Sequence, residues 1–68
     1  MTNEKVRKDF GGKLRRAREK AGMTQAEVAE KSGINISYYA KIERGEINTT
    51  IEKLHSIMKV LKLKSLNI

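Results

Sequence analysis

The segment from Thr24 to Gly45 constrains the fold most strongly, because it encodes two short helices separated by a glycine turn. Thr24 is a favourable N-cap residue, and Glu27 three positions later completes the spacing of a capping box. Gly33 stands where a residue with positive φ can end the first helix, and Asn35 can cap a second one. Gly45 is the expected stop of that second helix.

The second of these helices has an apolar side and a polar side. Tyr39 and Ile42 share one face at i, i+3. The other side carries Ser37, Lys41 and Arg44 at i, i+4 and i+7. A short helix, a glycine turn and a helix with a small polar outer face are typical of a helix-turn-helix, whose second helix enters the DNA major groove.

The composition argues against several classes of protein. The 68 residues include no cysteine and one histidine, so we expect no disulfide, metal site or cofactor. We expect no enzyme, since no Ser-His-Asp or Cys-His set is present and the GGK at 11–13 lacks the P-loop spacing. No run approaches the roughly 20 apolar residues of a membrane span, and the N-terminus is charged throughout. We therefore expect a soluble, cytoplasmic protein.

The charge is the second informative feature. Fifteen Lys and Arg against eight Asp and Glu give a net charge of +7, and the isoelectric point is about 10.0. This is the electrostatic signature of a nucleic-acid binder, although small basic domains also bind proteins or acidic lipids. The three aromatic residues are too few to form a stacking surface for single-stranded nucleic acid.

Two further helices are predicted on either side of this segment. Residues 3–21 have an amphipathic period and predict a helix capped by Thr2 or Asn3. Gly11 and Gly12 are unfavourable inside a helix, and they indicate either a bend or a close approach by another helix. Its apolar positions are Val6, Phe10, Leu14, Ala17 and Ala21. Residues 49–61 predict a helix opened by Thr49, with Glu52 completing a capping box. Its apolar stripe comprises Ile51, Leu54, Ile57, Met58, Val60 and Leu61.

The C-terminal tail, residues 62–68, keeps three large apolar residues, Leu63, Leu66 and Ile68. They need cover, either by folding back on the core or by a dimer contact, and we favour the dimer contact. His55 is interpreted as an ordinary surface histidine. Because no strand pattern occurs, we predict one all-α domain over residues 1–68, a compact bundle of four or five helices.

Roughly residues 10–63 resemble the Cro/repressor-type helix-turn-helix family, also called the XRE family. The resemblance rests on the runs LRRAREKAGMTQAEVA and IERG. It implies a lambda-repressor-like bundle of about five helices from a bacterium or phage. Such a bundle binds operator double-stranded DNA, usually as a two-fold dimer.

The resemblance also implies roles for single residues. The implied base-reading residues are Ile36, Ser37 and Lys41. Lys41 can donate hydrogen bonds to guanine, and Ile36 can contact a thymine methyl group. Arg18 and Glu43 match a pair that bridges the first and third helices inside the fold. Contacts to the DNA backbone are implied for Gln25, Asn35, Tyr38 and Arg44.

Two positions depart from the family pattern. Tyr39 stands where a smaller aliphatic residue is preferred, which predicts altered packing under the recognition helix. Lys62 stands where the family often has the glycine that ends the fourth helix. Because a fifth helix would lie in the tail, the mode of dimerisation is left open.

The leading hypothesis is a small transcriptional regulator that is expected to repress. A homodimer formed through the C-terminal region would read a near-palindromic operator with the helix at 35–44 in the major groove. The alternative is an antitoxin-type protein that mainly binds a protein partner and regulates its own gene through DNA. Co-purification with a neighbouring gene's product would favour that alternative. A module that has lost DNA binding is disfavoured, because Gln25, Lys41 and Arg44 keep useful chemistry.

Overall fold

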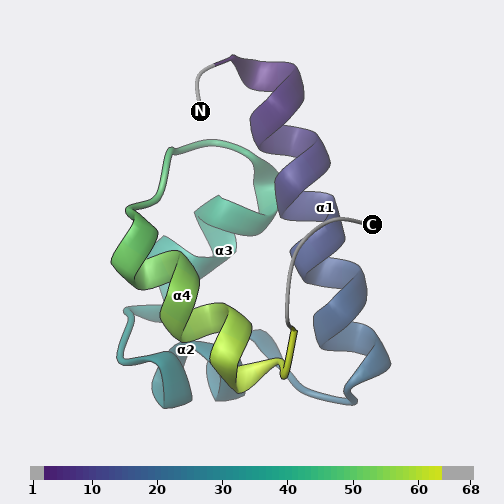
Figure 1. Ribbon diagram of the computed structural model, residues 1–68, viewed down its shortest axis with the longest axis vertical. Helices are drawn as coiled ribbons and strands as arrows, with labels where there is room; N and C mark the ends of the chain where they lie inside the picture. The colour runs from purple at the N-terminus through teal and green to yellow at the C-terminus, as the bar shows by residue number, and fades with distance from the viewer. Residues whose placement is uncertain (1–2, 64–68) are drawn as a thin grey trace.

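The computed structural model describes residues 3–63, and these form four helices and no strand (Figure 1). The helices are α1 (Glu4–Lys20), α2 (Gln25–Ser32), α3 (Ile36–Arg44) and α4 (Ile51–Val60). The long α1 runs down one side of the molecule and packs mainly on α3, while α2 packs on both α3 and α4. The all-α class is therefore confirmed. Most of the tail in which a fifth helix would lie, residues 64–68, is outside the described residues, so the choice between four and five helices stays a prediction there.

Each helix begins after an N-cap residue whose side chain accepts a hydrogen bond from a backbone amide of the first turn. Asn3 Oδ1 accepts from the Val6 amide at 2.9 Å, and Asn35 Oδ1 accepts from the Ser37 amide at 2.8 Å. The predicted capping box at α2 is confirmed: the Glu27 amide donates to Thr24 Oγ1 at 3.0 Å, and the Thr24 amide donates to Glu27 Oε1 at 2.7 Å. These contacts satisfy amide donors that have no partner inside a helix.

The predicted start of α4 is wrong. Thr50, not Thr49, is the N-cap, and its hydroxyl accepts from the Lys53 amide at 3.1 Å. Lys53 then occupies the third helical position, so Glu52 stands one place too early to close a capping box. Two adjacent threonines offer the same capping chemistry, and the local sequence does not choose between them.

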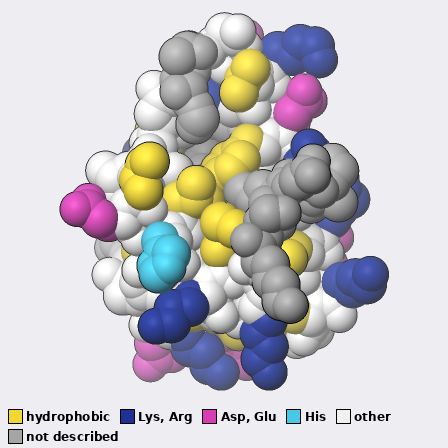
Figure 2. Space-filling view, in the orientation of Figure 1, with side chains coloured by type: hydrophobic (Ala, Val, Ile, Leu, Met, Phe, Trp, Pro, Cys, Tyr) yellow, Lys and Arg dark blue, Asp and Glu magenta, His cyan; other side chains and the backbone are white. Residues whose placement is uncertain are grey.

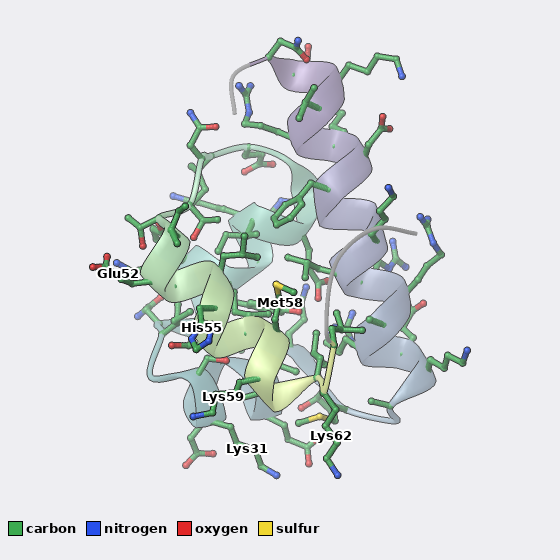
Figure 3. The ribbon with its side chains drawn as sticks, viewed as in Figure 1. Lys31, Glu52, His55, Met58, Lys59 and Lys62 are labelled. Carbon is green, nitrogen blue, oxygen red and sulfur yellow. The ribbon has the colours of Figure 1, made fainter. Side chains whose placement is uncertain are left out.

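Each of the four helices ends at a residue in the left-handed region, which is the C-cap itself in α2 and α3 and the residue after the C-cap in α1 and α4. At each end the amide of this left-handed residue and the amide that follows it donate to carbonyl oxygens of the last turn, which is the hydrogen-bond pattern of a Schellman motif. Three of these residues are glycines, with φ between 70° and 73°. The fourth is Lys62, with φ 58°, which is the predicted departure from a family glycine. Its side chain points away from α4 (Figure 3).

Lys62→Gly is expected to raise the free energy of unfolding by about 0.5–1 kcal/mol, because glycine adopts this conformation without a steric clash at Cβ. Urea denaturation followed by circular dichroism measures the change. Lys62→Ala is the control, since it removes the ammonium group but keeps the unfavourable backbone angle. If alanine stabilises the protein as much as glycine does, relief of backbone strain is not the cause.

The core lies where the four helices meet. α1 contributes Leu14, which is fully buried, whereas Val6 at its first turns is 44% exposed. α4 contributes Ile57, and its C-cap Leu61 is also buried. The predicted burial of Ile51 is wrong, since that residue is 81% exposed. The reason is helical geometry: Ile51 lies about 120° around the helix from Ile57, so it points away from α2. The buried apolar residues are Leu14, Val28, Ala29, Tyr39, Ile42, Ile57 and Leu61.

The contact between α1 and α3 is close at the level of the backbone. A Cβ atom at Gly11 would overlap the carbonyl oxygens of Ile42 and Glu43, so the predicted close approach of another helix is confirmed there. The turn after α3 is held by the same helix: a Cβ atom at Gly45 would lie 2.7 Å from the Cα of Lys8. In addition, Arg7 Nε donates to the Gly45 carbonyl oxygen at 3.1 Å. The C-terminal end of α3 is thus attached firmly to α1.

Candidate nucleic-acid interface

The outward side of α3 gathers the side chains expected to read bases. Ile36, Ser37 and Lys41 are all exposed. The opposite side of the same helix is buried, and Tyr39 and Ile42 have relative exposures of 0% and 2%. Nine residues of helix therefore divide into an apolar face that anchors the helix and a polar face that is open to a ligand.

A hydrogen-bonded network lies behind this face and joins three helices through the Glu43 carboxylate. From α1, Arg18 Nε donates to Glu43 Oε2 at 2.7 Å, and Arg18 Nη2 donates to Oε1 at 3.2 Å. From α2, Gln25 Nε2 donates to Oε1 at 2.9 Å. Arg18 Nη1 also donates to the Met23 carbonyl oxygen at 3.0 Å. The side chains of Arg18 and Glu43 are 12% and 2% exposed, so the pair is an internal one.

The electrostatics of the network follow from this geometry. Burial alone would raise the pKa of Glu43, but hydrogen bonds from Arg18 and Gln25 outweigh it and lower that pKa below its ordinary value. The same contact with Glu43 raises the pKa of Arg18. Burial also raises the pKa of the nearby Tyr39 hydroxyl, and the Glu43 carboxylate beside it adds to that shift. The carboxylate and the guanidinium therefore stay charged at neutral pH.

The residues expected to contact the DNA backbone differ from one another in their exposure and in their hydrogen-bond partners. Arg44 is exposed at the end of α3, while Gln25 is half-buried at the start of α2 with its amide on Glu43. The side-chain oxygen of Asn35 caps α3. Tyr38, for which the resemblance implies an exposed side chain that reaches the DNA backbone, is instead half-buried and packs against the core. Its hydroxyl lies 3.5 Å from the Asn48 carbonyl oxygen, because the loop before α4 folds over it.

Sequence reasoning missed Glu46, which lies just after α3. Arg44 Nε donates to Glu46 Oε2 at 2.8 Å, and Arg44 Nη2 donates to Oε1 at 3.2 Å. Hydrogen bonding to Arg44 lowers the pKa of Glu46, and Lys41 contributes to the same shift. A spacing of two residues does not predict a pair within a helix; the contact depends on the left-handed turn at Gly45.

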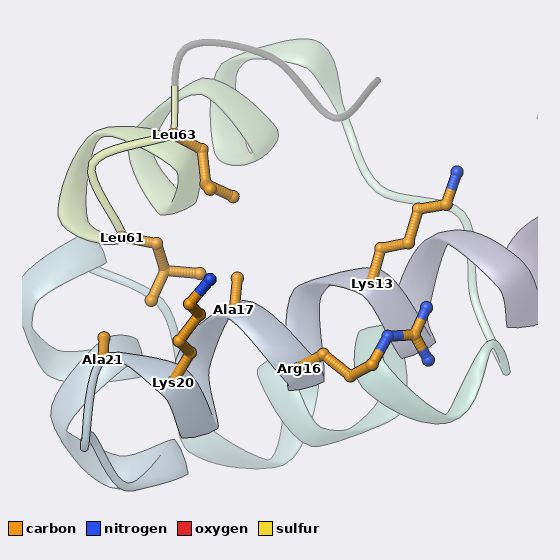
Figure 4. A pocket seen from close by; sticks show the side chains of 7 residues that line it. All are labelled: Lys13, Arg16, Ala17, Lys20, Ala21, Leu61 and Leu63. Carbon is orange, nitrogen blue, oxygen red and sulfur yellow. The ribbon is translucent and has the colours of Figure 1, made fainter. Parts of the chain in front are cut away.

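A second surface lies between α1 and the C-terminal end of α4. There a cavity of about 570 Å³ has an apolar lining formed by Leu61, Leu63, Ala17 of α1 and Ala21, the C-cap of α1 (Figure 4). Its rim carries three basic residues of α1: Lys13, Arg16 and Lys20. Figure 2 shows hydrophobic side chains gathered at the centre of the face that α4 presents, and His55 exposed beside them.

The described part of the chain holds no group of three or more metal-ligating side chains. Among residues 3–63, no helix has the length and apolar character needed to cross a membrane.

Comparison with known proteins places this arrangement among regulators. A family model described as helix-turn-helix matches residues 14–67. A curated relative, the uncharacterized HTH-type transcriptional regulator y4dJ of Sinorhizobium fredii (strain NBRC 101917 / NGR234), is 36% identical over 56 residues. That alignment covers 82% of this chain and 73% of the relative.

Two solved structures are similar in fold. The restriction–modification controller protein C.AhdI from Aeromonas hydrophila gives a TM-score of 0.82 at 30% identity, covering 84% of this chain and 86% of that chain. The clp gene regulator ClgR from Corynebacterium glutamicum gives a TM-score of 0.83 at 33% identity. The match covers 85% of this chain and 62% of ClgR. The family and the fold are those of DNA-binding regulators rather than enzymes.

Proposed function

Because the chain belongs to the XRE-type helix-turn-helix family of DNA-binding transcriptional regulators, we propose that it is a cytoplasmic repressor that reads a near-palindromic operator as a homodimer. The observation that carries this proposal is the division of α3. Its inner face is buried against the core, while Ser37, Lys41 and Arg44 are exposed along its outer face. A helix held in this way can enter a major groove without disturbing the core.

Each side chain has a distinct task in this proposal. Lys41 donates to guanine O6 and N7, Ile36 packs against a thymine methyl group, and Ser37 hydrogen-bonds a base edge. Gln25 at the start of α2 and Arg44 at the end of α3 contact phosphates on either side, which sets the register of the helix. The net charge of +7 favours association with DNA of any sequence.

The dimer is proposed to form through the C-terminal region. The support is the cavity beside α1, whose apolar lining includes Leu61 and Leu63. Apolar side chains at the end of α4 on one copy would be covered by the same region of a second copy, as an isologous two-fold contact requires. Sedimentation equilibrium, with and without DNA, measures the association state.

Selection from a random duplex library at about 150 mM salt, followed by sequencing, tests the proposal. A recovered palindrome would support specific dimeric recognition and would supply the operator. Recovery of a single half-site would keep DNA recognition but remove the dimer. The absence of enrichment, with binding that disappears as salt rises, would overturn the proposal and favour the antitoxin-type alternative with a protein partner.

Lys41→Ala is expected to weaken binding to the selected operator by about 1–3 kcal/mol and to relax the preference at one base position. The reason is that a lysine that donates hydrogen bonds to the edge of one base discriminates that base from the others. Fluorescence anisotropy with the operator and with variants at each position measures both effects.

Gln25→Ala is the comparison variant, because a phosphate contact carries no sequence information. It should weaken binding about equally on all duplexes. If Lys41→Ala also acts equally on all duplexes, Lys41 does not read a base.

A further inference from the structure

We infer that Glu46 is an affinity-limiting residue, whose carboxylate occupies the place that a DNA phosphate must take beside Arg44. This inference rests on the proposed function, because it gives Arg44 its phosphate contact. Glu46 lies just outside the helix-turn-helix segment, which ends at Gly45, and the inference gives this residue a role in DNA binding.

The contact between the two side chains has the geometry that an arginine uses for phosphate. Two guanidinium nitrogens of Arg44 face the two carboxylate oxygens of Glu46, at 2.8 and 3.2 Å. A phosphate would use the same fork of donors, since arginine binds carboxylate and phosphate in the same bidentate manner. Glu46 and a phosphate therefore compete for one set of donors.

The backbone holds Glu46 at this place. Its amide donates to the Lys41 carbonyl oxygen at 3.0 Å, as part of the turn that ends α3. The preceding residue, Gly45, is buried against the backbone of Lys8. The backbone of Glu46 is therefore held at the end of α3, while its side chain, which is 51% exposed, can rotate.

The position of the charge explains how binding is limited. The carboxylate lies beside Arg44 and close enough to Lys41 to be stabilised by its ammonium group. Bound DNA would bring phosphates toward the same cations, and like charges placed together oppose association. The free protein thus neutralises part of its own interface, which lowers its affinity for every duplex.

Glu46→Gln tests the inference. On the selected operator and on a scrambled duplex, this variant is expected to bind about three- to fivefold more tightly, as removal of one exposed charge contact allows. The salt dependence should steepen by up to about 0.9 in the slope of log K against log salt, since one more counterion is released. Fluorescence anisotropy at several salt concentrations measures both, and circular dichroism verifies that the variants are folded.

Glu19→Gln is the matched control. Glu19 forms an exposed pair with Arg15 at 3.1 Å on α1, and the substitution changes the net charge by the same amount. We expect it to alter the affinity less than about twofold. Arg44→Gln should weaken binding, and Glu46→Gln should then have little further effect, because the shared donors are gone.

Two results would overturn the inference while leaving the proposed function intact. One is that Arg44→Gln weakens binding but Glu46→Gln binds no more tightly than Glu19→Gln. The other is that Arg44→Gln leaves the affinity for the operator unchanged while Lys41→Ala lowers it. If the wild-type protein selects no operator, the proposed function fails and this inference fails with it.

Discussion

Gly11→Ala is expected to destabilise the protein by about 3 kcal/mol, which is enough to unfold much of the population. The added Cβ would overlap the backbone carbonyl oxygens of Ile42 and Glu43. Backbone atoms cannot rotate away as a side chain can, so α1 and α3 must move apart. The loss should occur even though alanine favours a helix over glycine by about 1 kcal/mol. Urea denaturation followed by circular dichroism measures the change.

Gly12→Ala provides the control, because it makes the same substitution one residue further along α1. Its Cβ would meet only the end of the Arg16 side chain, at 3.5 Å. This variant should therefore be more stable than the wild type by up to about 1 kcal/mol. If both variants have similar stabilities, the close approach at Gly11 does not govern the packing of α1 on α3.

Glu43→Ala is the second substitution with a large expected effect, a loss of about 3 kcal/mol in the free energy of unfolding. It leaves the guanidinium of Arg18 without its anion in a site where that side chain is 12% exposed, and it removes the acceptor of Gln25. Thermal and urea denaturation measure the loss. This loss lies at the low end for a broken internal pair, because the Arg18 side chain keeps 12% exposure to solvent.

Glu19→Ala breaks an exposed pair, whose side chains are 63% and 51% exposed, and it should cost at most about 0.5 kcal/mol. The contrast between the two variants separates an internal pair from a surface pair. Unchanged stability of Glu43→Ala, together with a selective loss of DNA binding, would place Glu43 in the interface instead of the fold.

The same network predicts a pH dependence of stability. Since the pKa of Glu43 is lowered in the folded state, its stabilising contribution is complete above the ordinary carboxylate value of 4.5. That contribution is lost as the pH falls through the lowered folded-state value. Glu43→Gln lacks this group, so the stability advantage of the wild type over the variant should shrink below pH 4.5.

Local chemistry explains what could be predicted from the sequence. The caps at Asn3, Thr24 and Asn35 bond amides within three residues, so they can be recognised without knowing the tertiary fold. The exposed stripe of α3 follows from helical period alone. At α4 the same reasoning failed, because Thr49 and Thr50 offer the same capping chemistry and the local sequence does not choose between them.

The contacts that could not be predicted join residues through turns or between helices. The hydrogen bond of Gln25 to Glu43 requires the relative placement of α2 and α3. Tyr38 becomes half-buried because the loop after α3 returns across it, which helical period does not predict. Glu46 reaches Arg44 only because Gly45 reverses the chain. No local pattern contains these three contacts.

The attachment of α3 to α1 has a consequence for how such a protein can change its target. The close backbone contacts with α1 lie between Ile42 and Gly45, at the C-terminal end of the helix. The exposed positions Ile36, Ser37 and Lys41 take no part in them. Side chains at those positions can therefore be exchanged without disturbing the contacts that hold α3 on α1. In evolution or in design, the exposed face of α3 can thus vary while the fold that holds the helix stays the same.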